Sequence, residues 1–166
     1  MRLLRALVIV ALFAVAVFIG YRFFVRPAPG AGSALVYYTK QDGQTLAQWR
    51  VSLNPQARDT GSIAFYATVQ NVAGPPSDVP AIRFPAGTVV HSVHVTGSTA
   101  TVDLGGKVAG EQSGSFAESG EFKALVWTLT ALPGISSVQV EIDGARVPTL
   151  PGGHLELDDP LTRQSW

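Results

Sequence analysis

The sequence predicts an α+β fold: a small mixed or antiparallel sheet of about five strands with two helices packed on it, plus one N-terminal transmembrane helix. Short apolar stretches bounded by Gly, Pro or Asp are typical of strands. In two other stretches the apolar residues recur at spacings of three and four, which is typical of helices. A charge-free apolar stretch near the N-terminus approaches the thickness of a membrane.

Residues 1–26 are predicted to form a transmembrane signal-anchor. The sixteen residues Ala6–Tyr21 carry no charge, and as a helix they span roughly 24 Å of the roughly 30 Å hydrocarbon layer. Snorkelling of Arg5 and Arg22 and a longer helix close the gap, so Leu3–Val25 is the expected membrane contact. A cleaved signal peptide is the alternative. We favour the uncleaved anchor, because small residues suited to cleavage follow only after a bulky, basic segment.

The charges around this segment do not fix its orientation, since two Arg stand on each side of it. The free N-terminal amine favours a cytoplasmic N-terminus. We therefore expect a single-pass cell-membrane protein whose C-terminal domain is extracytoplasmic. Residues 27–33, PAPGAGS, are too rich in Pro and Gly for a helix or strand and form a linker. The domain is expected over residues 34–163.

The domain is predicted to begin with a β-hairpin. Leu35–Tyr38 is a short apolar strand, Asp42-Gly43 makes a turn, and Leu46–Leu53 alternates as a second strand. One face of this second strand carries the apolar residues Ala47, Trp49, Val51 and Leu53.

The first helix is predicted over Ile63–Val72. Asp59 or Ser62 is the expected N-cap, because the side-chain oxygen of such residues accepts hydrogen bonds from the first backbone N–H groups. Gly74, followed by two prolines, ends the helix as a left-handed C-cap. The apolar residues at i, i+4 and i+7 are Phe65, Val69 and Val72.

Two strands and a loop follow. Val89–Val95 and Thr99–Leu104 are rich in β-branched residues and flank the tight connection Thr96–Ser98. Gly105–Gly114 contains four glycines and is predicted to be a loop.

The second helix is predicted to start at Ser115, where Glu118 three residues later completes a capping box. Pro133-Gly134 ends it. The apolar stripe of this helix consists of Phe122, Leu125, Val126, Leu129 and Leu132.

A last strand is predicted over Ser136–Ile142, with Val138, Val140 and Ile142 on one face. Asp143-Gly144 then turns the chain. One more strand is possible at His154–Leu157.

Composition excludes several functions. The chain contains no cysteine, which rules out disulfides, thiol catalysis, thiolate zinc sites and lipid attachment through an N-terminal cysteine. Beyond Pro27, eight Lys and Arg stand against twelve Asp and Glu, a formal charge of −4. The basic residues are scattered, whereas nucleic-acid binding needs them clustered. Nucleic acid is therefore not an expected partner.

Catalytic motifs are incomplete. Residues 110–114, GEQSG, place Ser113 at the wrong spacing for the serine motif of hydrolases. Gly105-Gly106-Lys107 lacks the upstream glycine of a phosphate loop, and Val108 replaces its hydroxyl residue. Both stretches are better explained as ordinary loops.

The histidines do not predict a metal site. His91 and His94 are three residues apart on a predicted strand, so we expect their side chains on opposite faces. His154 with Asp158 and Asp159 is a better cluster, because carboxylates and imidazole can share a cation. Acidic residues near a C-terminal turn are, however, usually just solvated.

The remaining candidates have structural explanations. Turn formation accounts for Asp42, Asp103 and Asp143, which stand beside Gly or at strand ends. No catalytic, cofactor-binding or metal site is therefore predicted, and no enzyme activity is expected. Core positions are expected for most of the aromatic residues that could bind a sugar or peptide: Tyr37, Tyr38, Trp49 and Trp127.

Several short motifs follow one another in a fixed order and resemble the GerMN domain, a module of sporulation and spore-germination proteins. The resemblance covers Ala34–Arg163, and its most specific part is the helix ending followed by an alternating strand and Asp-Gly. Two departures stand out: Gly105 replaces a serine frequent in the family, and the first helix is short. The motifs are Gly74-Pro75, FPAGTV at 84–89, Val102–Leu104, LVWTLTALPG at 125–134, residues 138–144 and DPLTR at 159–163.

The resemblance implies a non-enzymatic, membrane-anchored module for protein–protein assembly outside the cytoplasm, similar in fold to the ring-building modules of secretion-type complexes. Other envelope proteins or further copies of the chain are the expected partners. A cell-wall glycan-binding module is the alternative, acting through Trp49 or the Gly105–Gly114 loop, and exposure of Trp49 would favour it. An enzyme is a weaker third hypothesis, which a pocket uniting His154 with two carboxylates would favour.

Overall fold

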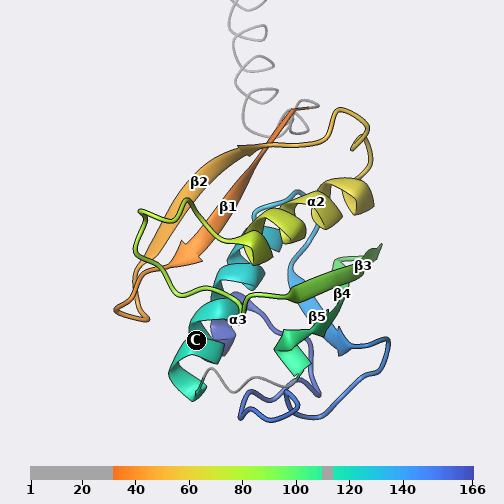
Figure 1. Cartoon of the computed structure of the whole chain (residues 1–166). Coiled ribbons are helices and arrows are strands. Elements are labelled where there is room, and N and C mark those ends of the chain that lie inside the picture. Colours follow the sequence, from red (N-terminus) through yellow and green to blue (C-terminus); the bar gives the residue numbers. More distant parts are fainter. Residues whose placement is uncertain (1–31, 110–113) are drawn as a thin grey trace, which may run out of the picture. The chain divides into compact units, whose positions relative to one another are not determined.

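The computed structural model describes residues 32–109 and 114–166 (Figure 1). The predicted anchor, most of the linker and residues 110–113, including Ser113, lie outside these ranges. No helix in the described part of the chain is both long and apolar enough to cross a membrane.

The predicted hairpin is present. Strands β1 (Ser33–Thr39) and β2 (Leu46–Ser52) pair antiparallel. At the turn, the Asp42 carboxylate accepts hydrogen bonds from the backbone N–H of Gln44 at 2.9 Å and of Thr45 at 2.8 Å. These bonds confirm the turn-forming role predicted for Asp42.

Helix α2 (Thr60–Ala73) begins three residues before the predicted start at Ile63. Both predicted caps take part, because Asp59 is the N-cap and Ser62 completes the capping box from position N3. At the other end, Gly74 has φ +80°, a conformation that favours glycine.

The second sheet contains β3 (Thr88–Thr96), β4 (Thr99–Gly106) and β5 (Ser137–Ile142) in that order. β3 and β4 are antiparallel, whereas β4 and β5 are parallel and joined through a helix. The loop predicted over Gly105–Gly114 is partly wrong, since Gly105 and Gly106 end β4 and residues 107–109 form the 3₁₀ helix η1.

Helix α3 (Ser115–Leu129) is the central element and contacts β1, α2 and β5. The capping box predicted for its start is wrong: the N-cap is Gly114, and no side chain caps the helix. Glu118 instead turns inward, is 1% exposed, and accepts a hydrogen bond from the backbone N–H of His154 at 2.9 Å. The Glu118 carboxylate therefore binds the C-terminal tail at His154 and does not take part in a capping box at the start of α3.

The core lies between the helices and one face of the three-stranded sheet. In this face Val93, Val102 and Val140 are neighbours in register, and all three are buried. Phe122 from α3 belongs to the same buried hydrophobic cluster as these valines. The predicted inward face of β5 is confirmed, because Val138, Val140 and Ile142 are buried.

The predicted single sheet is wrong, because β1–β2 and β3–β4–β5 are separate sheets. The free edge of β1 bonds to helix side chains in place of another strand. The backbone N–H of Tyr37 donates to the Thr128 hydroxyl of α3 at 2.9 Å, and its C=O accepts from the Asn71 side chain of α2 at 2.8 Å.

The possible strand at His154–Leu157 does not form, since this stretch makes only an isolated bridge between Thr149 and Glu156. The tail nevertheless covers the edge of β5. Val138 and Leu161 exchange backbone hydrogen bonds of 2.9 and 2.7 Å. The chain then ends with the 3₁₀ helix η2 (Arg163–Ser165).

Candidate functional site

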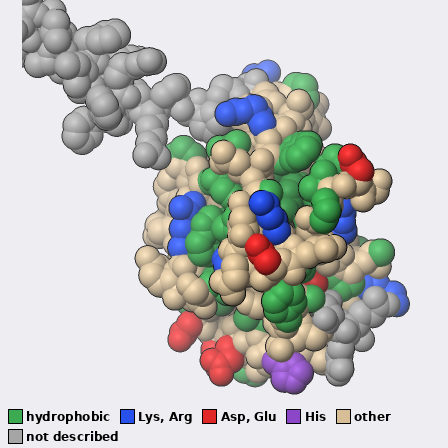
Figure 2. Space-filling view, turned by 90° about the vertical axis from the view of Figure 1, so that its left-hand side faces the viewer, with side chains coloured by type: hydrophobic (Ala, Val, Ile, Leu, Met, Phe, Trp, Pro, Cys, Tyr) green, Lys and Arg blue, Asp and Glu red, His purple; other side chains and the backbone are tan. Residues whose placement is uncertain are grey.

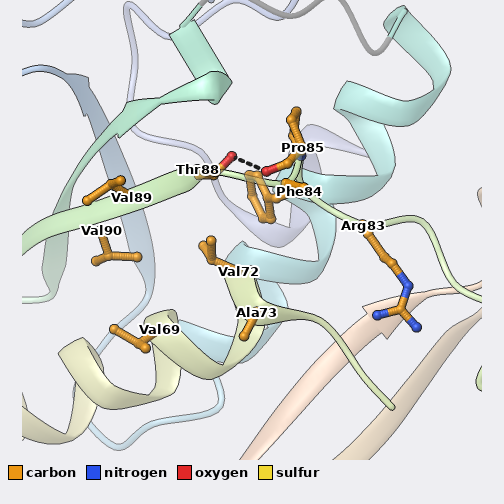
Figure 3. A pocket seen from close by; sticks show the side chains of 11 residues that line it. Val69, Val72, Ala73, Arg83, Phe84, Pro85, Thr88, Val89 and Val90 are labelled. Carbon is orange, nitrogen blue, oxygen red and sulfur yellow. Dashed lines mark hydrogen bonds between the residues drawn. The ribbon is translucent and has the colours of Figure 1, made fainter. Parts of the chain in front are cut away.

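An apolar groove of about 530 Å³ lies between the C-terminal half of α2 and the start of β3 (Figure 3). Its floor and walls come from three segments: α2, the loop before β3, and the first residues of β3 itself. The lining residues are Val69, Val72, Ala73, Arg83, Phe84, Pro85, Ala86, Gly87, Thr88, Val89 and Val90.

Local sequence shapes this groove. Val69 and Val72 belong to the apolar face predicted for the first helix, and in Figure 3 they lie across the groove from Val90. Val89 is the neighbour of Val90 on the strand; it lines the groove too, and its side chain is 45% exposed.

The loop before β3 is held in a fixed turn. The Thr88 side chain and backbone N–H both donate to the Pro85 carbonyl, at 2.8 and 3.0 Å. The Phe84 ring is buried edge-on against Phe122, with ring centroids 5.4 Å apart. These contacts give the groove a preformed wall.

Arg83 stands at one end of the groove. Its guanidinium donates to three backbone carbonyls, those of Pro75 at 2.6 Å, Pro76 at 2.8 Å and Val79 at 3.1 Å. All three acceptors are neutral, and within residues 32–109 and 114–166 no carboxylate forms a salt bridge with Arg83. Burial raises the pKa of the Tyr38 phenol, and the nearby Arg83 charge opposes that rise.

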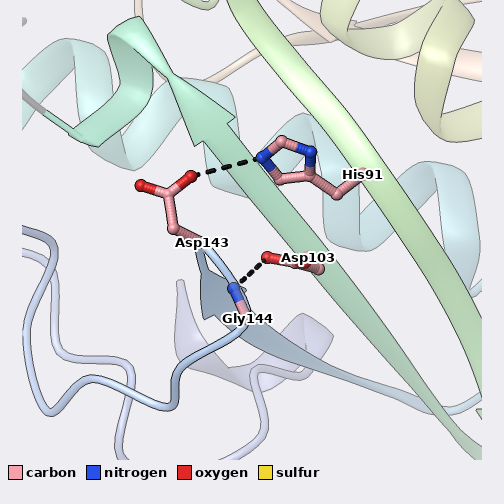
Figure 4. A network of polar contacts seen from close by, with 4 residues as sticks. All are labelled: His91, Asp103, Asp143 and Gly144. Carbon is pink, nitrogen blue, oxygen red and sulfur yellow. Dashed lines mark hydrogen bonds and ion pairs between the residues drawn. The ribbon is translucent and has the colours of Figure 1, made fainter.

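A second polar arrangement lies on the open face of the β3–β4–β5 sheet (Figure 4). His91 Nε2 lies 3.2 Å from the Asp143 carboxylate, and Asp103 accepts a hydrogen bond from the Gly144 backbone N–H at 2.8 Å. A Cβ at Gly105 would collide with both His91 and Asp143. The absence of a side chain at Gly105 therefore leaves room for this pair.

The prediction that His91 and His94 point to opposite faces is wrong. A β-bulge between Val90 and Ser92 shifts the register, so His91 lies over Gly105 while His94 pairs with Thr101 on the same face. The two histidines are four β4 residues apart, about 13 Å at 3.3 Å per residue. Among the described residues, no three His, Cys, Asp or Glu form a group able to hold a metal ion.

His154, Asp158 and Asp159 line a pocket of about 380 Å³ beside Trp166, which is the arrangement named above as favouring the enzyme hypothesis. They do not come together as a metal-binding group within the described ranges. Lys107 lies in η1, with its aliphatic chain against Gly87. Two of the three aspartates that the sequence assigned to turns, Asp103 and Asp143, link the end of β4 to the turn after β5. Asp103 accepts from the Gly144 N–H, and the Asp143 N–H donates to the Leu104 carbonyl.

The aromatic candidates divide between core and surface. Tyr38 is buried, and Trp127 is half-buried with Trp166 edge-on at 6.0 Å and Arg163 at 5.6 Å from its ring. The core position expected for Trp49 is wrong, because Trp49 is 42% exposed on β2. Figure 2 shows hydrophobic side chains on one face in small groups among Lys, Arg, Asp and Glu.

Sequence reasoning missed the groove. Residues 84–88 marked the family resemblance and gave no indication of a cavity. The usable signal was the adjacent pair Val89-Val90, because consecutive residues of a strand face opposite sides and one aliphatic side chain must then lie outside the core.

The chain folds into a GerMN-type α+β domain. A family model described as "Germane: Sporulation and spore germination" matches residues 35–148. This range is more than half of the chain, and the protein belongs to that family.

Solved structures share the fold. The first GerMN domain of the sporulation protein GerM from Bacillus subtilis is 21% identical, with a TM-score of 0.60 over 80% of this chain and 98% of that one. The tandem GerMN domains of the same protein are 18% identical, with a TM-score of 0.59 over 79% of this chain and 45% of that one. A putative lipoprotein from Clostridium perfringens is 18% identical, with a TM-score of 0.55 over 80% of this chain and 87% of that one. The present chain thus spans less than half of the tandem, and these identities establish the fold alone. No curated protein matches the sequence.

Proposed function

We propose that this protein is a non-enzymatic, membrane-tethered assembly module, which binds other envelope proteins or further copies of itself outside the cytoplasm. The observation that carries the proposal is the preformed apolar groove between α2 and β3, with Val89 exposed beside it. Exposed apolar surface of this kind, rimmed by polar residues, is typical of protein interaction sites.

The tether supports the same proposal. The apolar stretch within residues 1–26 would hold the domain at the membrane surface. Confinement raises the effective concentration of a partner in the same membrane, so a modest groove suffices for assembly.

The test is in-cell chemical crosslinking of the tagged full-length protein in its host, followed by mass spectrometry. The proposal predicts reproducible crosslinks to envelope proteins or to higher-order forms of the chain. Recovery of the monomer alone, under conditions that crosslink a known membrane complex, contradicts it.

One observation favours a second candidate, a cell-wall glycan-binding module: Trp49 is exposed on β2, and exposed aromatic rings commonly stack on sugars. The test is co-sedimentation of the purified protein with isolated cell walls. Glycan binding predicts that Trp49→Ala abolishes sedimentation while Trp127→Phe does not, and absence of sedimentation for the unchanged protein removes this candidate.

A further inference from the structure

The two sheets have four outer edges, and the chain itself covers two of them. Thr128 and Asn71 occupy the edge of β1, and the C-terminal tail occupies the edge of β5 through Leu161. Only β2 and β3 remain open among the described residues. Apart from its ladder with β4, the backbone of residues 89–96 has no hydrogen-bond partner in the described part of the chain, whereas the Thr88 N–H already donates to the Pro85 carbonyl at 3.0 Å.

The two open edges differ in chemistry. Natural proteins protect open edges with charged residues, proline or β-bulges, because an unprotected edge pairs with other strands; β3 has a bulge at His91 and none of the other devices. β2 carries Arg50 in its middle, whereas β3 contains no Lys, Arg, Asp, Glu or Pro along its nine residues. The bulge at His91 leaves Thr88–Val90 as the regular segment next to the groove.

The groove continues this edge. A strand added beside Thr88–Val90 would direct every second side chain towards α2, where Val69, Val72 and Val90 form an apolar wall. Among the described residues, Arg83 is the one ionisable side chain that lines the groove, and its hydrogen bonds there go to neutral carbonyls. One kind of occupant fits all three features: the open backbone edge of β3, the apolar wall and the positive charge of Arg83.

We propose that the groove and the β3 edge bind an extended segment of another envelope protein, which adds a strand along Thr88–Val90, buries aliphatic side chains between β3 and α2, and places a carboxylate near Arg83. This inference rests on the proposed assembly function and names the surface and the chemistry of its partner. Strand addition draws affinity from main-chain hydrogen bonds and specificity from alternate side chains.

The test is site-specific photo-crosslinking of the full-length protein in its host membrane. p-Benzoylphenylalanine replaces Val89 in one variant, Gln48 on β2 in a second and His94 on the open sheet face in a third; all three residues are exposed. The expected result is a discrete adduct from position 89 alone. Mass spectrometry of that adduct should map it to a partner segment with alternating aliphatic residues and at least one Asp or Glu.

A second measurement tests the charge. In the position-89 crosslinking protein, Arg83→Gln is expected to lower the adduct yield about tenfold, as loss of one charge-assisted contact does, while Arg50→Gln leaves it unchanged. Thermal unfolding of both variants verifies that the fold persists. If Arg83→Gln unfolds the domain, Arg83→Lys serves in its place, since it keeps the charge and must retain most of the adduct.

The outcomes separate the two proposals. Adducts only from positions 48 or 94 overturn the β3 inference and leave the assembly function standing. A position-89 adduct that maps to a helical or basic segment overturns the stated partner chemistry. Absence of adducts from all three positions overturns the assembly function and, with it, this inference.

Discussion

The backbone N–H of Tyr37 donates a 2.9 Å hydrogen bond to the hydroxyl of Thr128, 91 residues further along the chain. The same hydroxyl donates to the Ala124 carbonyl at 2.8 Å. Thr128 thereby acts as the partner that a neighbouring strand would otherwise supply to β1. This contact separates the two sheets and joins the hairpin directly to α3.

Thr128→Val removes this hydroxyl while keeping the side-chain shape. Thr128 is 0% exposed, so the Tyr37 N–H loses its partner without access to water, and we expect a loss of about 1–3 kcal/mol of unfolding free energy. Urea unfolding of the soluble domain measures it. Thr101→Val, on the open face of β4, is the matched control and should change stability by less than about 0.5 kcal/mol. Equal effects for both variants would argue against the role of Thr128.

The caps of the two helices provide a paired test. Asp59→Ala removes the N-cap of α2 and should cost about 0.5–2 kcal/mol of unfolding free energy. Ser115→Ala should cost almost nothing, because no side chain caps α3. Urea unfolding of both variants measures the difference. A comparable loss of unfolding free energy for Ser115→Ala would indicate that the Ser115 side chain does cap α3, against the structure.

Gly120 lets α3 approach the loop before β3. A Cβ at this position would lie 2.5 Å from the Ile82 side chain, so Gly120→Ala is expected to destabilise the domain by about 1–3 kcal/mol through overpacking. Adding Ile82→Ala should recover part of that loss, since it removes the colliding atoms. A double-mutant cycle measures the coupling, and strictly additive effects would refute the contact.

Asp42 makes the hairpin turn sensitive to acid. Hydrogen bonds from the Thr45 side chain, and from the backbone N–H groups of Thr45 and Gln44, lower the pKa of Asp42 from 3.8 to about 2. A depressed folded-state pKa means that the stabilisation is fully present above pH 3.8 and is lost as the pH falls towards 2. A carboxyl NMR titration measures this pKa directly. Thr45→Val should raise the Asp42 pKa, and an unchanged value would contradict the assigned cause.

The tether gives a cellular prediction. Deletion of residues 1–26 should move the protein from the membrane fraction to the soluble fraction, because the apolar stretch would supply the membrane affinity. Protease added outside intact cells should cut the domain of the full-length protein. Carbonate extraction and protease accessibility measure the two effects. A full-length protein that carbonate extracts, or that protease reaches only after lysis, would contradict the proposed topology.

Local patterns predicted most of the elements. Periodicity located both helices and the strands of the two hairpins, and the breaks at Gly74 and Asp42-Gly43 stand where expected. Such features depend on neighbouring residues, so a single sequence contains them. The resemblance to the GerMN family came from the order of its motifs, which the family match over residues 35–148 confirms.

Features that depend on distant contacts could not be predicted. In the sequence, Asn71 and Thr128 are ordinary polar residues within helices. Only the structure shows that they bond the Tyr37 backbone at the edge of β1, where a strand of the second sheet would otherwise pair. Glu118 fits a local capping box, yet the tail at His154 binds it. The bulge that moves His91 to the open face leaves no mark in an alternating sequence.

The groove is the central element of this account, and a single in-cell comparison tests it most directly. Val89→Lys places a charge beside the groove on the β3 edge, whereas Gln48→Lys places the same charge on the open edge of β2. Quantitative crosslinking of the full-length protein is predicted to lose its envelope partner in Val89→Lys and to keep it in Gln48→Lys, with both domains folded. Wild-type crosslinking of a folded Val89→Lys protein would contradict the account.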